Sequence, residues 1–512
     1  MTTKTAGGWR RRGLAVTCGL LAAGAAAAAW LCWPHARPSV VLVTVDTLRP
    51  DRLGAYRRTF NRTPAIDRLA AEGMLFETAY CDVPWTTASM SSVMTGQYSN
   101  VHGVEFPTHR LDAAAVTMAE RFQQAGYQTG AVIGSFPLDS IYGLDQGFES
   151  YDQEFDRPMI AVPGAVVKHV EAQLASEGEG KGADNFLEKM RNDAYRDDES
   201  VTDAALRWLT QKRDPSRPFF LWVHYYGPHE KWLGDRGFVE QEPDVIAAYD
   251  PDVEKNDTAV GRLLDYLRSS GLLDRSLVVL HSDHGQNLGE HGFVGHGSRI
   301  DEQTVRVPMI LRYPAEIPAG LRRKDIARNI DILPTVLAAA GLPAEGLAGR
   351  SMLPSGDDPE GLRVAHEAQT AYFETHLTTL NYVPLWAPPH GTVLGPVWRT
   401  GLRTTEWKLL EDQVTGPCRS GLQATRDGVG SWSIFNSQEL PEEDCRAIRQ
   451  RRLLDAAYLP SREVEVTSAK PELLESLSEL LAGYREQKAS MAGQFQLSPD
   501  AEQKLRSLGY LR

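Results

Sequence analysis

The chain has 512 residues, 42% of them hydrophobic, which is enough for one large α/β domain and a smaller one. Its formal net charge of −13 argues against a protein that binds nucleic acid, because such proteins need a basic face for the phosphate backbone. The five cysteines include no C-x-x-C pair and no cluster with histidine at zinc-finger spacing.

The N-terminal segment combines positive charge with a long apolar run. Lys4 and the arginines at 10–12 precede an apolar stretch over residues 13–33. This order is that of a signal peptide, and about twenty apolar residues are also enough to span a bilayer. Because the alanine-rich run shows no clear cleavage site, we interpret residues 1–36 as an N-terminal membrane anchor, with a cleaved signal peptide as the alternative.

Export follows from either interpretation. Since positive residues stay on the cytoplasmic side, the catalytic part is expected in the periplasm or at the cell surface, attached to the membrane by residues 13–33. In such a compartment Cys418 and Cys445 can form a disulfide, and two free thiols are the equally weighted alternative.

The next part of the chain alternates apolar runs with helical patterns. Continuous runs rich in β-branched residues at 40–45, 218–223 and 276–281 are typical of strands buried on both faces of a parallel sheet. Shorter strands are expected at 129–133 and 306–312, and helices at 63–73, 113–126, 251–270 and 331–341. This alternation predicts an α/β fold whose mostly parallel central sheet is covered by helices on both faces.

The pattern changes in two places. Residues 148–214 are polar and are interpreted as an insertion with helical pieces. Beyond residue 350, the segments 400–404 and 407–411 indicate an antiparallel pair. We therefore expect a catalytic domain at 38–350 and a smaller α+β subdomain at 351–512.

Each of the three long apolar strands ends in side chains that can bind a metal or move a proton. Asp46 follows the first strand, His224 and His229 the second, and Asp283-His284 the third. Because parallel strands end at one edge of a sheet, where ligands bind, these groups are expected to lie together. One aspartate or histidine alone would more often be a cap or a structural group. Thr86, at a turn-to-helix junction, adds a hydroxyl that a metal can activate.

Ordered motifs over residues 40–353 strengthen this interpretation. They are Val45-Asp46-Thr47-Leu48-Arg49, Thr95-Gly96, His102-Gly103, Pro228-His229, Ser282-Asp283-His284-Gly285, Gly289-Glu290-His291-Gly292, His296-Gly297 and Arg306-Val307-Pro308. With these motifs the chain resembles the sulfatase family of the alkaline phosphatase superfamily. The resemblance implies an alkaline-phosphatase-like fold and a metal-dependent hydrolase of sulfate esters or related phosphate esters and diesters.

The resemblance also implies roles for single residues. The family's nucleophile stands at a fixed distance before the Thr-Gly pair, which places it at Thr86. Asp46, Thr86, Asp283 and His284 would then share one divalent cation, and His229 and His296 would contact the ester oxygens or the leaving group. For His224 and His291 a direct role is weighed against packing or hydrogen bonding to the ligands.

Several positions depart from the family pattern. Thr47 replaces a second acidic ligand, and His284 stands where many sulfatases have asparagine. This exchange of a carboxylate for an imidazole favours Mn²⁺, Zn²⁺ or Mg²⁺ over Ca²⁺. Two cationic groups of the pattern are also missing, because Met90 replaces an arginine and Gly134-Ser-Phe-Pro replaces a Gly-Lys-Trp-His loop.

The most consequential departure is the nucleophile itself. Family maturation converts cysteine or serine to formylglycine, and Thr86 cannot follow that route. A sulfated threonine has no geminal hydroxyl that could expel sulfate, so water would have to attack the sulfur. Thr86 therefore favours phosphate esters or diesters, whereas the overall resemblance favours sulfate esters.

Two other functions remain open at this stage. One is an envelope phosphotransferase that passes a phosphoryl group from Thr86 to an acceptor alcohol. The other is an inactive protein that binds anionic glycans. The expected ligand is a small-molecule or glycan ester, whose sugar or aryl group Trp386, Trp398 or Trp432 could stack upon, although such residues more often belong to a core. The sequence carries no signal for the oligomeric state.

Overall fold

The computed structural model describes residues 37–56, 61–105, 109–157, 195–229, 242–290, 294–354, 370–375, 397–404 and 406–414, together with short pieces between 419 and 494. The predicted anchor, His291, Trp386 and the two cysteines Cys418 and Cys445 lie outside the described residues. In the part that is described, no helix is both long enough and apolar enough to cross a bilayer.

The centre of the fold is an eight-stranded sheet with the order β11-β2-β10-β7-β1-β6-β4-β5. All neighbouring strands are parallel except β10, which runs antiparallel to β2 and β7. The predicted mostly parallel sheet is thus confirmed. Its strands are β1 (Ser39–Val45), β2 (Met74–Tyr80), β4 (Gln128–Val132), β5 (Ser150–Asp152), β6 (Phe219–Tyr225), β7 (Ser276–His281), β10 (Met309–Arg312) and β11 (Leu321–Arg328).

Strand β1 lies between β6 and β7, and its register explains where the functional groups gather. Thr44 stands beside His224 of β6 on one side and beside His281 of β7 on the other. The three strands therefore end level with one another. The residues that follow them meet at one edge of the sheet, as expected for parallel strands.

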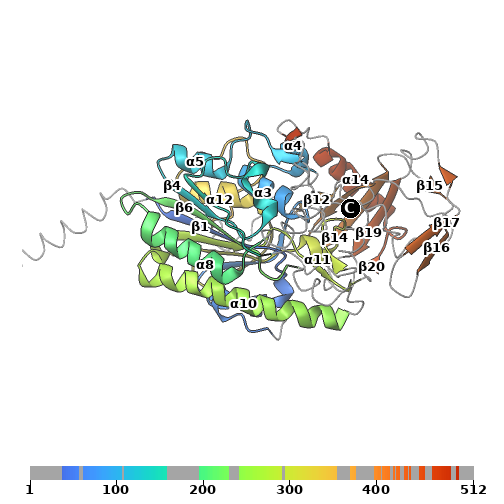
Figure 1. Ribbon diagram of the computed structural model, residues 1–512. Coiled ribbons are helices and arrows are strands. Elements are labelled where there is room, and N and C mark those ends of the chain that lie inside the picture. Colours follow the sequence, from blue (N-terminus) through green and yellow to red (C-terminus); the bar gives the residue numbers. More distant parts are fainter. Residues whose placement is uncertain are drawn as a thin grey trace, which may run out of the picture. The chain divides into compact units, whose positions relative to one another are not determined.

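Helices cover both faces of this sheet (Figure 1). On one face lie α2 (Pro64–Ala71), α8 (Asp198–Arg207) and α10 (Glu242–Ser269), which share a core with Val41 and Val43. On the other lie α3 (Thr86–Thr95), α5 (Met118–Gln124) and α12 (Ile332–Ala339), whose core includes Val40 and Leu42. Successive residues of β1 thus point to opposite faces and are buried on both, which is why the strand reads as one continuous apolar run.

A separate antiparallel sheet with the order β12-β13-β14-β19-β20 forms the C-terminal region. It confirms the antiparallel pair predicted near residues 400–411. Its strands are β12 (Ala371–Thr375), β13 (Val397–Arg403), β14 (Trp407–Val414), β19 (Arg449–Asp455) and β20 (Val464–Glu465), and α14 (Pro471–Arg485) packs against them. The other α-helices and strands of the described residues are short: α4 (Ser99–His102), α11 (Glu302–Val305), β3 (His109–Leu111), β8 (Asn287–Leu288), β9 (Val294–Gly295), β15 (Arg419–Ser420), β16 (Gln423–Arg426), β17 (Trp432–Phe435), β18 (Gln438–Glu439) and β21 (Ala492–Gln494).

Two predicted helix starts and the interpretation of residues 148–214 were wrong. Helix α5 begins at Met118 instead of residue 113, because Thr117 and Glu120 form a capping box there. Helix α10 begins at Glu242, so Pro251 lies inside it instead of at its start. The polar segment 148–214 is not simply an insertion, since β5 is an edge strand of the central sheet and α8 packs on its face.

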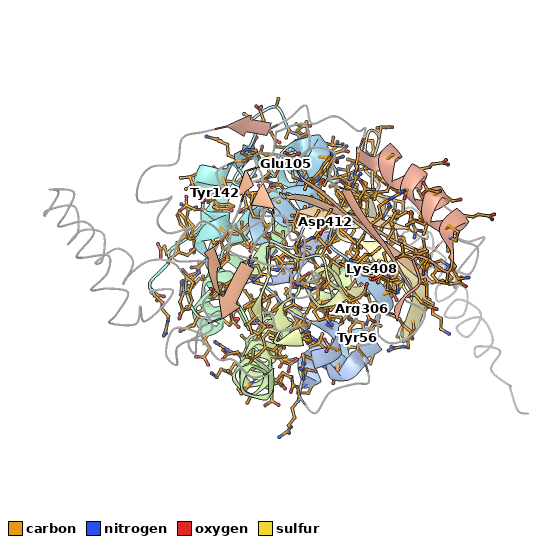
Figure 2. The ribbon with its side chains drawn as sticks, turned by 90° about the vertical axis from the view of Figure 1, so that its right-hand side faces the viewer. Tyr56, Glu105, Tyr142, Arg306, Lys408 and Asp412 are labelled. Carbon is orange, nitrogen blue, oxygen red and sulfur yellow. The ribbon has the colours of Figure 1, made fainter. Side chains whose placement is uncertain are left out.

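Buried charges join the two sheets at Glu302. Its carboxylate accepts a hydrogen bond of 3.0 Å from the Tyr80 hydroxyl, and lies 3.3 Å from Lys408 Nζ and 3.4 Å from Arg403 Nε. Burial raises the pKa of Glu302, but Lys408, Arg403 and Arg306 outweigh it and lower the pKa to about 2. Figure 2 labels Lys408 and Arg306 in this region.

Replacing Glu302 by glutamine is expected to destabilise the fold by about 3–5 kcal/mol, because it removes a buried carboxylate that lies against the buried cations Lys408 and Arg403. A depressed carboxyl pKa stabilises the folded state above the unfolded pKa, and this contribution is lost as the pH falls from 4.5 towards about 2. Urea unfolding at pH 7 and pH 3 measures both effects. A variant that unfolds at the same urea concentration as the parent at pH 7 would contradict the assignment.

Candidate active site

Two carboxylates and one imidazole meet where β1 and β7 end. Asp46, Asp283 and His284 are fully buried, and each offers a ligand atom within 4.8 Å of the others. His284 Nε2 lies 3.6 Å from Asp46 Oδ1 and 3.4 Å from Asp283 Oδ2. Such a group of two carboxylate oxygens and one imidazole nitrogen fits a divalent cation.

The protonation of His284 suits a metal ligand. Its Nδ1 lies 3.0 Å from the Gly285 carbonyl oxygen, to which it donates, so the lone pair is on Nε2 and faces the two carboxylates. Burial lowers the pKa of His284 to about 4, against the opposing effect of Asp283. The imidazole is therefore neutral at physiological pH, as a metal ligand must be.

Thr86 reaches the same group from helix α3. It is the first residue of α3 and is fully buried, and its Oγ1 lies 3.2 Å from His284 Nε2. The hydroxyl thus meets the same nitrogen that faces Asp46 and Asp283. Its position at a helix N-terminus also favours negative charge on, or transferred to, this oxygen.

His229 and His296 lie beside the group. Their ring centroids are 5.0 Å apart, and the His296 ring stacks on His284 at 4.5 Å. The Tyr226 hydroxyl lies 2.6 Å from His229 Nδ1, and His296 Nδ1 lies 2.8 Å from Gln286 Oε1. All six residues expected in the site are therefore brought together: Thr86, Asp283 and Asp46 lie 3.2, 3.4 and 3.6 Å from His284 Nε2, and His229 and His296 lie beside this group.

Comparison with known proteins agrees with this arrangement. The sulfatase family model matches residues 38–342. The chain belongs to the sulfatase family. An N-acetylglucosamine-6-O-sulfatase of Bacteroides thetaiotaomicron is 24% identical to it over 66% of this chain and 74% of that protein.

Solved structures agree with the fold of this sulfatase. One, described as bound to its substrate D-glucosamine-2-N,6-O-disulfate, has a TM-score of 0.61 and 20% identity over 88% of this chain and 98% of that one. Another is a phosphonate monoester hydrolase of Silicibacter pomeroyi, with a TM-score of 0.56 and 16% identity over 88% and 95% of the two chains. The family match and the sulfatases found by sequence support a sulfuric ester hydrolase.

At two positions where the family pattern has a positively charged side chain, this sulfatase has uncharged residues. Met90 is fully buried in the core beneath the site. In the loop after β4, Phe136 packs edge-on against Tyr142, and the Pro137 carbonyl accepts a hydrogen bond from the Thr87 hydroxyl. These residues belong to, pack against or hydrogen-bond to α3 and do not supply positive charge.

His224 is close to the ligands without hydrogen-bonding to them. Its Nε2 lies 3.9 Å from Asp46 Oδ2, and burial lowers its pKa to about 3. Neither ring nitrogen has a hydrogen-bond partner among the described residues. Trp398, considered above as a stacking surface, donates its indole N–H to Glu374 instead.

The sequence reasoning missed the residues that hold the site in shape. Arg49 donates to the Gln286 carbonyl oxygen and to Glu290, and so joins the loop after β1 to the hairpin that carries His296. The Asn329 amide and the Ser89 hydroxyl both donate to the Asp283 carbonyl oxygen. Arg49 is the last residue of the motif that begins at Val45, but nothing in the sequence indicates its hydrogen-bond partners.

Proposed function

We propose that this sulfatase-family chain is a metal-dependent hydrolase that uses Thr86 as its nucleophile. The observation that carries the proposal is that the Thr86 hydroxyl contacts His284 Nε2, the same nitrogen that faces the carboxylates of Asp46 and Asp283. A bound divalent cation would neutralise charge on the ester and lower the pKa of the hydroxyl. Mn²⁺, Zn²⁺ and Mg²⁺ suit the imidazole better than Ca²⁺ does.

The reaction we propose has two halves. In the first, Thr86 Oγ1 gives its proton to a neighbouring base and forms a bond to the central atom of the ester, while the bond to the leaving oxygen breaks and a histidine protonates the departing alkoxide. In the second, water gives one proton back to that histidine and attacks the same central atom, and the released Thr86 oxygen takes its proton back from the base. Each half transfers one group and consumes no oxidant or reductant.

Hydrogen bonds distinguish the two histidines beside the group. His296 donates from Nδ1 to Gln286 Oε1, so its neutral ring has a lone pair at Nε2 and suits an acceptor. The Tyr226 hydroxyl hydrogen-bonds to His229 Nδ1, so a protonated His229 can give its other proton, on Nε2, to the leaving group. We therefore assign proton donation to the leaving group to His229.

The Tyr226→Phe variant tests this assignment. It keeps the ring that stacks on His229 but removes the 2.6 Å hydrogen bond. We expect kcat to fall about tenfold or more for alkyl esters, which need the proton, and little for p-nitrophenyl esters, which do not. An equal fall for both substrates would assign Tyr226 a purely structural role.

Thr86 also bears on the substrate class. Since threonine cannot become formylglycine, we propose that esters of phosphorus are turned over faster than sulfate esters. The fold that the chain shares with phosphonate monoester hydrolases supports a site of this kind. A screen of aryl sulfates, phosphate monoesters, phosphodiesters and phosphonates against Mn²⁺, Zn²⁺, Mg²⁺ and Ca²⁺ ranks them directly. Faster turnover of aryl sulfate would overturn this preference.

The two alternative functions predict different outcomes in the same screen. A phosphotransferase would pass the labelled group to an added alcohol faster than to water. An inactive glycan-binding protein would turn over none of the substrates and would not need a stoichiometric cation. We also propose that the protein is exported and anchored by residues 13–33, which membrane fractionation of the full chain tests.

A further inference from the structure

Thr47, directly after the ligand Asp46, has an unusual backbone conformation. Its φ is +56°, and among the described residues every other positive φ belongs to glycine. A β-branched side chain is strained in this region, and such strain persists only where the surroundings impose it. Local strain of this kind is concentrated at functional sites.

Contacts from two separate segments hold Thr47 and its neighbour in place. Its N–H donates to Asp283 Oδ1 at 3.3 Å, and its carbonyl oxygen accepts from the Tyr249 hydroxyl at 2.7 Å. The next residue, Leu48, donates its N–H to Ser282 Oγ at 2.9 Å. The backbone is therefore fixed before and after the Thr47 side chain. A change of the Thr47 backbone angles would break these hydrogen bonds.

The hydroxyl group of Thr47, unlike its backbone, has no hydrogen bond among the described residues that explains its position. The residue is fully buried, and Oγ1 has no hydrogen-bond partner among the described residues. Asp283 Oδ2, on the residue whose other carboxylate oxygen binds the Thr47 amide, is also buried without a hydrogen bond. A buried hydroxyl in a strained residue is costly unless something binds it.

We propose that the Thr47 hydroxyl is a further, neutral oxygen ligand of the cation held by Asp46, Asp283 and His284. This inference rests on the proposed metal-dependent function. It explains why the loop keeps a strained threonine whose hydroxyl hydrogen-bonds to none of the described residues.

The charge of the site gives a reason for a neutral group here. Asp46 and Asp283 together balance one divalent cation. A third carboxylate at position 47 would leave a net negative site that repels an anionic ester. Met90 and the loop at Phe136 supply no positive charge against such an excess. The neutral Thr47 removes one negative charge from the site and so offsets the loss of the positively charged groups.

The test measures metal binding to the metal-free protein, without turnover. Thr47→Val keeps the shape and removes the hydroxyl, and Thr47→Gly removes it while allowing the positive φ without strain. In titrations with Mn²⁺ followed by calorimetry, both variants are expected to bind about 10-fold or more weakly, whereas Thr47→Ser binds like the parent. The metal-free Thr47→Val protein should unfold at the same or a higher temperature, because an unpaired buried hydroxyl is gone.

The outcomes separate this inference from the function on which it rests. If the parent binds one Mn²⁺ and Thr47→Val and Thr47→Gly bind it equally well, the hydroxyl is not a ligand, and the inference fails while the metal site stands. If the parent binds no cation, the proposed function fails first. Thr47→Asp should bind Ca²⁺ more tightly than the parent and raise KM for the anionic ester. Unchanged Ca²⁺ affinity and KM would refute the charge argument.

Discussion

The Thr86→Ala variant is expected to lose at least about 10⁴-fold in kcat, as enzymes do when a covalent nucleophile is removed. The Thr86 hydroxyl is fully buried and lies 3.2 Å from His284 Nε2, and no other side-chain hydroxyl hydrogen-bonds to that nitrogen among the described residues. Alanine keeps the helix start at residue 86, since it is an excellent helix former. Steady-state kinetics with the best substrate of the screen gives the number.

Thr86→Ser is the matched control. Serine keeps the oxygen, so most of the activity should remain, although a freer side chain is held less well than a β-branched one. Acid quenching during turnover should trap a phosphoryl or sulfuryl group on the peptide that contains residue 86 of the parent. Full turnover by Thr86→Ala would eliminate the mechanism. A labelled peptide elsewhere would do the same.

The Asp283→Asn variant is expected to lose the cation while keeping its fold. Asp283 Oδ1 accepts N–H groups from Thr47 at 3.3 Å and from His284 at 2.9 Å, and an amide oxygen can retain both bonds. The buried Oδ2 becomes an NH₂ group, which cannot coordinate a cation. We expect metal affinity to fall about 100-fold or more, with kcat/KM at least about 10³-fold lower.

Thermal unfolding with and without metal adds a reading that is independent of turnover. A cation at about 1,000 times its dissociation constant stabilises the parent by about 4 kcal/mol, and the variant should lose this gain. Without metal, the variant should be at least as stable as the parent, because one of two neighbouring buried carboxylates has become neutral. A variant that is less stable than the parent with metal but not without it has lost a ligand, whereas a damaged fold would be less stable under both conditions.

Asp82→Asn is the matched control for Asp283→Asn. Asp82 is a buried carboxylate four positions before Thr86, and it accepts hydrogen bonds from Ser92 and Ser99. Burial raises its pKa to about 7, so an uncharged side chain is tolerated there. It lies outside the group around His284, and metal affinity should stay within about threefold of the parent. An equal loss of metal affinity in both variants would contradict the assignment of Asp283 as a metal ligand.

The sequence was most informative where a local pattern and the sheet topology act together. Apolar runs at 40–45, 218–223 and 276–281 predicted β1, β6 and β7, because strands buried on both faces need such runs. Parallel strands end at the same edge, so Asp46, His229 and Asp283 could be predicted to meet. The boundaries of α5 and α10 were predicted less well, since caps and tertiary contacts override periodicity there.

Other features of the site depend on residues far apart in the chain. Thr47 is held by Tyr249 and Asp283, and Arg49 by Gln286 and Glu290, each across 200 residues or more. A motif shows which side chains are present but not which of them remain without a partner. From the sequence alone follow the family, the sheet and the candidate ligands, because periodicity and strand ends are local properties. The strained Thr47, the separate environments of His229 and His296, and the buried link at Glu302 follow from the packed structure, because they depend on how distant loops hydrogen-bond to one another.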